Sequence, residues 1–132
     1  LVEKAGERVK FTGYIENQKL YRYYQSADIQ VIPSLWEEAA GLIAIEGMLS
    51  GLPLIITKSG GMIEYAPSNV AVWIDRDNII PNLEAAIIQL ADDKEKRKEM
   101  SELSLEQAKE FPKKKFYEDY IEVFEHEGTR KR

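Results

Sequence analysis

The stretch that decides the fold is IQVIPSLWEEAAGLIAIEGMLSGLPLIIT, residues 29–57. It begins with the apolar run IQVIPS, which Pro33 ends, and it closes with LPLIIT at 52–57. Both runs are typical of buried strands. Between them, GLIAIEGMLSG at 41–51 predicts a helix with Gly51 at its C-terminal stop. Two apolar strands joined by a helix predict a parallel sheet with a right-handed crossover.

The same alternation continues on both sides of this stretch. VKFTG at 9–13 predicts a strand, and NQKLYRYYQSAD at 17–28 has the apolar spacing of the helix that follows it. VAVWI at 70–74 supplies a further strand, reached through the loop KSGGMIEYAPSN, and apolar stripes predict helices from about residue 83 to 125. We therefore expect an α/β fold, a Rossmann-like parallel sheet with helices on both faces. Its strands are expected near residues 9–12, 29–32, 54–57 and 70–74.

Composition limits the function classes. A chain of 132 residues with 44% hydrophobic content suits one domain, and 18 Lys+Arg against 23 Asp+Glu give a formal charge of -5, which disfavours nucleic acid as a partner. The absence of Cys excludes disulfides and thiolate chemistry, and the lone His126 is expected to be solvated rather than to bind a metal. No run approaches the ~20 apolar residues of a membrane span, and no signal peptide is seen. We expect a cytoplasmic protein without a metal site.

The candidate binding residues lie just after the strands, where ligands bind in open α/β sheets. The loops GYIEN, PSLWEEAAG and TKSGGMIE are rich in small residues or carboxylates. In the second loop, the backbone N–H groups of Ala40, Gly41 and Leu42 stand at the start of a helix. Unpaired donors and the helix dipole make this an anion site that suits a pyrophosphate.

Two glutamates flank this anion site. Glu38 precedes the helix and Glu46 lies inside LIAIEGML, a separation of roughly 12 Å if helical. Because a nucleotide sugar presents hydroxyls on both sides of its diphosphate, we assign Glu38 to the sugar and Glu46 to the ribose. The alternatives are that Glu38 is an ordinary helix-terminal carboxylate, that Glu46 faces solvent, and that Gly60 and Gly61 only form a turn.

PSLWEEAAGLIAIEGMLSGLPLIITKSGGMIE resembles the signature stretch of the retaining family 4 glycosyltransferases of GT-B fold (glycosyl transferases group 1). That signature has two glutamates separated by seven residues, followed by G-x-P and a GG-x-x-E loop. VKFTGYI and YYQSADIQVIPS resemble the strand, helix and strand that precede it in the family. The resemblance runs from about Val9 to Phe124 and implies the C-terminal half of a GT-B fold without its first strands.

The resemblance also implies roles for individual residues. Glu38 would be the catalytic residue at the donor sugar, and Glu46 would hold the ribose hydroxyls. The remaining donor contacts would come from small loop residues: Ala40, Gly41 and Leu42 at the diphosphate, Gly13 and Tyr14 at the base, and Gly60 and Gly61 near the donor. Ala39 and Ala40 stand where the family commonly has Gly and a bulky aromatic residue, so the donor-sugar pocket is expected to differ.

The function implied is hexosyl transfer, with retention, from a nucleoside diphosphate sugar to a saccharide or lipid-linked acceptor. UDP is the favoured nucleotide of the donor, GDP and ADP remain open, and no cofactor is expected. Leu1 stands inside what reads as the end of a helix, so residues 1–132 are expected to be a partial domain. The family's N-terminal domain and its phosphate-neutralising Arg and Lys would lie upstream, which predicts an inactive fragment. The net charge disfavours anionic lipid as a partner of this chain, and peripheral association with the inner face of a membrane is left open for the full-length parent enzyme.

Two other functions fit the residues. One is a noncatalytic nucleotide-binding module. The other is a sugar-nucleotide epimerase or a phosphorylase-like enzyme of GT-B fold, which shares the general layout. Two glutamates at this spacing favour transfer over both.

Overall fold

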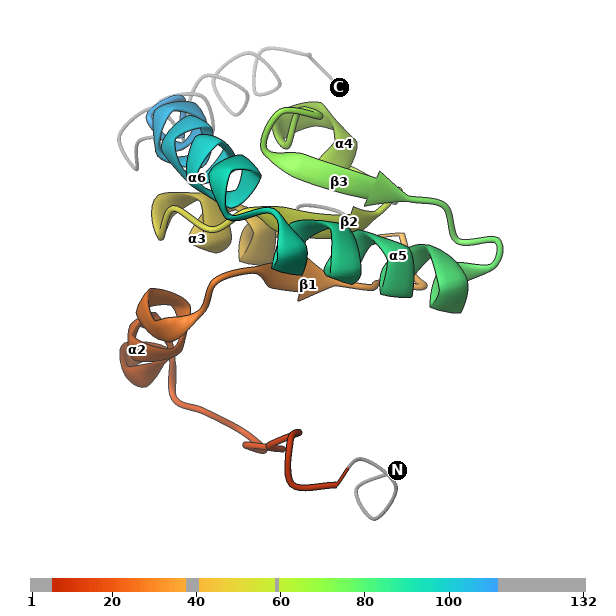
Figure 1. The fold of residues 1–132 in the computed structure, drawn as a ribbon. Coiled ribbons are helices and arrows are strands. Elements are labelled where there is room, and N and C mark those ends of the chain that lie inside the picture. The colour runs from red at the N-terminus through yellow and green to blue at the C-terminus, as the bar shows by residue number, and fades with distance from the viewer. Residues whose placement is uncertain (1–5, 38–40, 59, 112–132) are drawn as a thin grey trace, which may run out of the picture.

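The computed structural model describes residues 6–37, 41–58 and 60–111. Within them, three parallel strands form one sheet in the order β1-β2-β3 (Figure 1). The strands are β1 (Gln30–Ile32), β2 (Leu54–Thr57) and β3 (Ala71–Ile74). In register, Val31 lies opposite Ile55, which in turn lies opposite Val72. The predicted parallel α/β fold is confirmed.

Helices connect and cover the strands. They are α2 (Asn17–Ser26) before β1, α3 (Leu42–Leu49) between β1 and β2, α4 (Met62–Tyr65) between β2 and β3, and α5 (Ile79–Asp92) and α6 (Lys94–Ala108) after β3. As the sequence predicted, no long helix separates β2 from β3, because the connecting loop holds only the single turn of α4.

The apolar residues of β2 alternate between two cores, one on each face of the sheet. Leu54 and Ile56 are buried in the cluster that contains Met48 of α3. Ile55 faces the other way and is buried with Leu90 of α5. All five side chains are fully buried, which stabilises the fold through the hydrophobic effect. Burial on both faces explains why β2 is a continuous apolar run, and it confirms helices on both faces of the sheet.

The strand expected at residues 9–12 does not form. Val9 and Phe11 are 50% and 57% exposed, and the segment before α2 runs away from the sheet (Figure 1). A strand is stabilised by ladder hydrogen bonds and by packing against neighbours, and among the described residues no strand lies beside this segment. The β-rich composition of VKFTG therefore predicted a strand that has no partner here.

The C-terminal helical region is described as far as residue 111. The expected helices from about residue 83 are present as α5 and α6, although α5 begins earlier, at Ile79. Residues 112–132, which include the third apolar stripe and His126, lie outside the described residues. Among the described helices, none combines the length and apolar character that crossing a bilayer requires.

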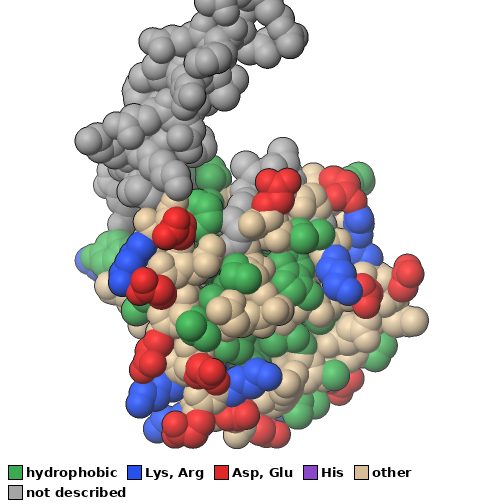
Figure 2. Space-filling view, turned by 90° about the horizontal axis from the view of Figure 1, so that it is seen from above, with side chains coloured by type: hydrophobic (Ala, Val, Ile, Leu, Met, Phe, Trp, Pro, Cys, Tyr) green, Lys and Arg blue, Asp and Glu red, His purple; other side chains and the backbone are tan. Residues whose placement is uncertain are grey.

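β3 forms one edge of the sheet. Seen from this side, hydrophobic side chains gather in the middle of the face and charged ones at its periphery (Figure 2). Val72 and Trp73 line two open hollows of about 240 and 370 Å³, between β3 and the two following helices. The indole Nε1–H of Trp73 donates to the carbonyl oxygen of Ala66 at 3.1 Å, which fixes the ring beside α4.

Candidate functional site

The loops that follow β1, β2 and β3 meet at the edge of the sheet where the parallel strands end. The hydroxyl of Thr57, the last residue of β2, donates to the carbonyl oxygen of Ser34 at 2.6 Å. This bond ties the end of β2 to the loop after β1. We call the edge formed by residues 34–37, 58, 60–61 and 75–76 the strand-end rim.

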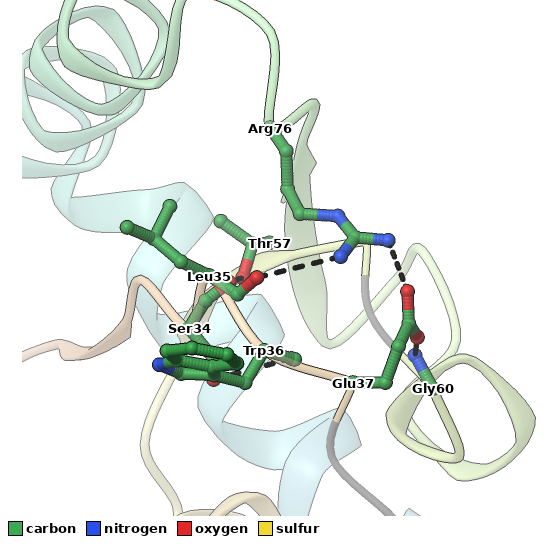
Figure 3. A network of polar contacts seen from close by, with 7 residues as sticks. All are labelled: Ser34, Leu35, Trp36, Glu37, Thr57, Gly60 and Arg76. Carbon is green, nitrogen blue, oxygen red and sulfur yellow. Dashed lines mark hydrogen bonds and ion pairs between the residues drawn. The ribbon is translucent and has the colours of Figure 1, made fainter.

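Glu37 joins all three loops of the strand-end rim. Its Oε2 accepts a hydrogen bond from the backbone N–H of Gly60 at 2.7 Å, and its Oε1 pairs with Nη2 of Arg76. Arg76 also reaches the carbonyl oxygen of Leu35 through Nη1 at 3.5 Å (Figure 3). One exposed carboxylate thus connects the ends of the three strands.

A second ion pair crosses the same edge. Nζ of Lys58, directly after β2, lies 2.8 Å from Oδ1 of Asp75, directly after β3. Both side chains are exposed, and exposed ion pairs add little to global stability. The two bridges therefore order the loops more than they stabilise the fold, and they neutralise Lys58 and Arg76 locally.

The Glu37 bridge predicts a pH-dependent rim. The hydrogen bond from Arg76, the hydrogen bond from the Gly60 amide and the charge of Arg76 together hold the pKa of Glu37 below its usual value. A carboxyl whose folded-state pKa is depressed contributes its stabilisation at neutral pH and loses it as the pH falls through that pKa. We expect the NMR resonance of the Gly60 amide to move with a midpoint below the usual glutamate range, and Glu37→Gln to remove this transition.

Asp75→Asn is the matched control for that titration, because Asp75 is a paired rim carboxylate that pairs with Lys58. The variant should leave the Gly60 transition in place. A Gly60 amide that is insensitive both to pH and to Glu37→Gln would contradict the bridge.

The candidate anion site begins at Gly41. This residue is buried, precedes α3 and has a left-handed backbone with φ of 49°, a conformation that glycine adopts without the steric cost of a Cβ atom. Among the described residues no side chain caps α3, and Leu42, its first residue, is 59% exposed. The helix start and its positive dipole end are therefore built as the sequence suggested. Glu38 and Ala40, which the sequence assigned to the same site, lie outside the described residues.

Glu46 contacts a residue of α2 and not a residue of the strand-end rim. Its Oε2 accepts a hydrogen bond from the hydroxyl of Tyr24 at 2.8 Å, although the two residues are 22 positions apart. Tyr24 lies near the end of α2, which leads directly into β1, so this contact is directed toward the side of the sheet where the strands begin (Figure 1). The structure brings Glu46 together with α2 and not with the Glu37 bridge.

The environment of Tyr24 keeps its hydroxyl protonated. Burial, followed by the hydrogen bond to Glu46 and the charge of Glu46, raises the pKa of Tyr24 to about 12, against a smaller opposite effect of Gln30. Tyr24 is therefore a hydrogen-bond donor throughout the physiological range.

The four other predicted residues fall into two groups. Gly60 belongs to the strand-end rim through its N–H, and Gly61 follows it at the start of α4. Gly13 and Tyr14 lie in the segment that runs away from the sheet, and Tyr14 is 90% exposed (Figure 1). The structure does not bring Gly13 and Tyr14 to the rim.

Sequence reasoning missed Glu37 and Arg76. The available signal was their position, because both stand within a few residues of a strand's carboxyl end, in the place where ligand-binding residues are sought. The sequence interpretation assigned roles to Glu38 and Glu46 and gave none to Glu37, which adjoins Glu38. Among the described residues, no cluster of His, Cys, Asp or Glu has the arrangement of a metal site.

A basic pocket lies at the opposite end of the sheet. Lys94, Arg97 and Lys98 of α6 line a hollow of about 350 Å³ together with Asp28 and Pro53, the residues that lead into β1 and β2. Arg97 already donates to the carbonyl oxygens of Leu90 and Ala91, at the end of α5. The three basic side chains and Asp28 give this pocket a mixed charge with an excess of positive groups.

Comparison with known proteins gives a consistent result. A D-inositol 3-phosphate glycosyltransferase of Corynebacterium diphtheriae is 32% identical over 105 residues, which are 79% of this chain and 24% of that protein. Mannosylfructose-phosphate synthase of Agrobacterium fabrum is 39% identical over 56 residues, 42% of this chain and 12% of that protein. This chain therefore spans about a quarter of these relatives or less.

The fold has a close counterpart among solved structures. Sucrose-phosphate synthase from Thermosynechococcus elongatus matches with a TM-score of 0.80 at 26% identity, over 93% of this chain and 32% of that one. The family model "Glycosyl transferases group 1" matches residues 2–107. The chain belongs to the glycosyl transferases group 1 family.

Proposed function

We propose that this chain is part of the donor-binding domain of a retaining glycosyltransferase, which moves a hexosyl group from a nucleoside diphosphate sugar to a saccharide or lipid-linked acceptor. The observation that carries the proposal is the strand-end rim, where Glu37 joins the loops after all three strands beside the start of α3. In open α/β sheets a phosphate-bearing ligand binds at this edge, against the N-terminus of a helix.

The roles proposed for the residues follow the parts of a donor. The diphosphate would lie against the amides of Ala40, Gly41 and Leu42, where the helix dipole favours the negative charge that builds up on the departing diphosphate. Glu38 would act at the donor sugar, and Glu46 would accept hydrogen bonds from the ribose. Glu46 is exposed about one turn into α3, and Tyr24 holds it on the side of the sheet where the strands begin, so the ribose would have to extend from the strand-end rim along α3 to reach it.

The remaining proposed contacts are with the base and with the sugar of the donor. Gly60 and Gly61 would lie near the sugar, and Gly13 and Tyr14 would border the base, which requires the segment before α2 to lie closer to the rim than it does here. UDP is the proposed nucleotide. The chain spans about a quarter of its relatives or less, so the acceptor site is assigned to the rest of a longer enzyme.

Binding by this chain alone should be weak. Lys58 and Arg76, the described basic side chains of the strand-end rim, are each paired with a carboxylate. Leu42, the first residue of α3, is 59% exposed, and water weakens each charge interaction with a diphosphate several-fold. We expect dissociation constants in the millimolar range and no sugar transfer.

Calorimetric titration of the chain with UDP, GDP, ADP and uridine tests the proposal. We expect UDP to bind more tightly than uridine, because the diphosphate engages the start of α3. Equal affinity for UDP and uridine, or robust sugar transfer by the chain alone, would contradict this assignment.

A further inference from the structure

Two side chains, the buried Gln30 and the half-buried Tyr24, form a support behind Glu46. Gln30, the first residue of β1, is 9% exposed, and its Nε2 donates to the carbonyl oxygen of Ile43 on α3 at 3.0 Å. Gln30 also lies near enough to the hydroxyl of Tyr24 to lower its pKa slightly. The same hydroxyl donates to Oε2 of Glu46. The carboxylate of Glu46 is thus connected to the sheet through Tyr24.

The close approach of this support to α3 depends on Gly47. A Cβ atom at this position would stand 1.7 Å from Oε1 of Gln30. Because residue 47 has no side chain, Gln30 can lie against α3 directly beside Glu46. Glu46 therefore lies next to the one position of α3, Gly47, that lets Gln30 approach the helix.

We propose that Tyr24 is a positioning residue for the donor nucleotide. Its hydroxyl would fix the Glu46 carboxylate in the orientation that accepts hydrogen bonds from the two vicinal hydroxyls of a ribose. This inference rests on the proposed function, in which Glu46 binds the ribose. Tyr24 takes one lone pair of Oε2, and the acceptor sites that remain on the carboxylate are enough for a diol.

The chemistry of Tyr24 suits this task. With its pKa raised, the hydroxyl stays protonated and can donate to the ionised carboxylate of Glu46. The ring is half-buried against the core cluster that includes Met48, so the hydroxyl is held on a rigid support. A phenylalanine would keep the ring and remove only the hydrogen bond.

The test compares UDP with 2′,3′-dideoxy-UDP on the wild-type chain and on Tyr24→Phe. We expect the wild-type chain to prefer UDP, and Tyr24→Phe to reduce this preference about two- to tenfold, the effect of losing one hydrogen bond. Affinity for the dideoxy nucleotide should not change. Tyr23→Phe is the matched control, because Tyr23 is the adjacent, exposed tyrosine of α2, and it should retain the full preference.

The outcomes separate this inference from the proposed function. If Tyr24→Phe is folded and keeps the full preference for the ribose, Tyr24 does not position Glu46, while the ribose assignment stands. If the wild-type chain does not distinguish the two nucleotides, the ribose assignment fails and this inference fails with it. The side-chain carboxyl ¹³C resonance of Glu46 gives a second readout without ligand, since it should shift in Tyr24→Phe and not in Tyr23→Phe.

Discussion

Replacing Gly47 by alanine is expected to destabilise the chain by about 1–3 kcal/mol, the usual cost of overpacking a dense core. The new Cβ atom would stand 1.7 Å from Oε1 of Gln30 and 2.9 Å from Cδ2 of Leu54. Gln30 would have to move and would lose its hydrogen bond to Ile43, which outweighs the ~1 kcal/mol that alanine gains over glycine in a helix. Urea denaturation followed by circular dichroism measures the change.

Two controls identify the cause of this destabilisation. Leu49→Ala changes an exposed residue of the same helix and should have a much smaller effect. In a Gln30→Ala background, the Gly47→Ala step should cost less, because the side chain it meets first is gone. A Gly47→Ala chain as stable as the wild type would show that Gln30 does not lie against α3 as described.

Replacing Glu46 by glutamine is expected to weaken the binding of UDP about tenfold. The substitution keeps the shape of the side chain and an oxygen that accepts from Tyr24, but it replaces charge-assisted hydrogen bonds to the ribose by neutral ones. A tenfold loss corresponds to about 1.4 kcal/mol, within the range for hydrogen bonds to a charged group. Calorimetry with UDP measures it.

Glu84→Gln is the control for this second change. Glu84 is an exposed residue of α5 and carries the same charge, so its substitution tests whether the loss follows from net charge alone. Equal losses in both variants, or no loss in Glu46→Gln, would contradict the ribose assignment.

The sequence predicted the parts of the fold that local patterns determine. LPLIIT is apolar because β2 is buried on both faces, and IQVIPS and VAVWI are apolar because β1 and β3 are partly covered, so these runs indicate parallel strands. The same reasoning was wrong for residues 9–12, because a β-rich run forms a strand only beside another strand. Local composition does not show whether such a neighbour is present.

The contacts of the candidate site were harder to predict because they join distant parts of the chain. Glu37 meets Arg76, which is 39 positions away, and Tyr24 meets Glu46 across 22 positions. Strand order determines the first pair, and the packing of Tyr24 against the core cluster that includes Met48 of α3 determines the second. The sequence did predict that the loops after β1 and β2 share one edge, because the carboxyl ends of parallel strands meet there.

A nucleoside diphosphate is proposed to bind at the strand-end rim and the start of α3. The most direct test is an NMR titration of the ¹⁵N-labelled chain with UDP. We expect the amide resonances of Gly41, Leu42 and Gly60 to shift together at millimolar UDP, while uridine has a smaller effect. Shifts confined to Lys94, Arg97 and Lys98 in the basic pocket at the other end of the sheet, or no shift at all, would contradict it.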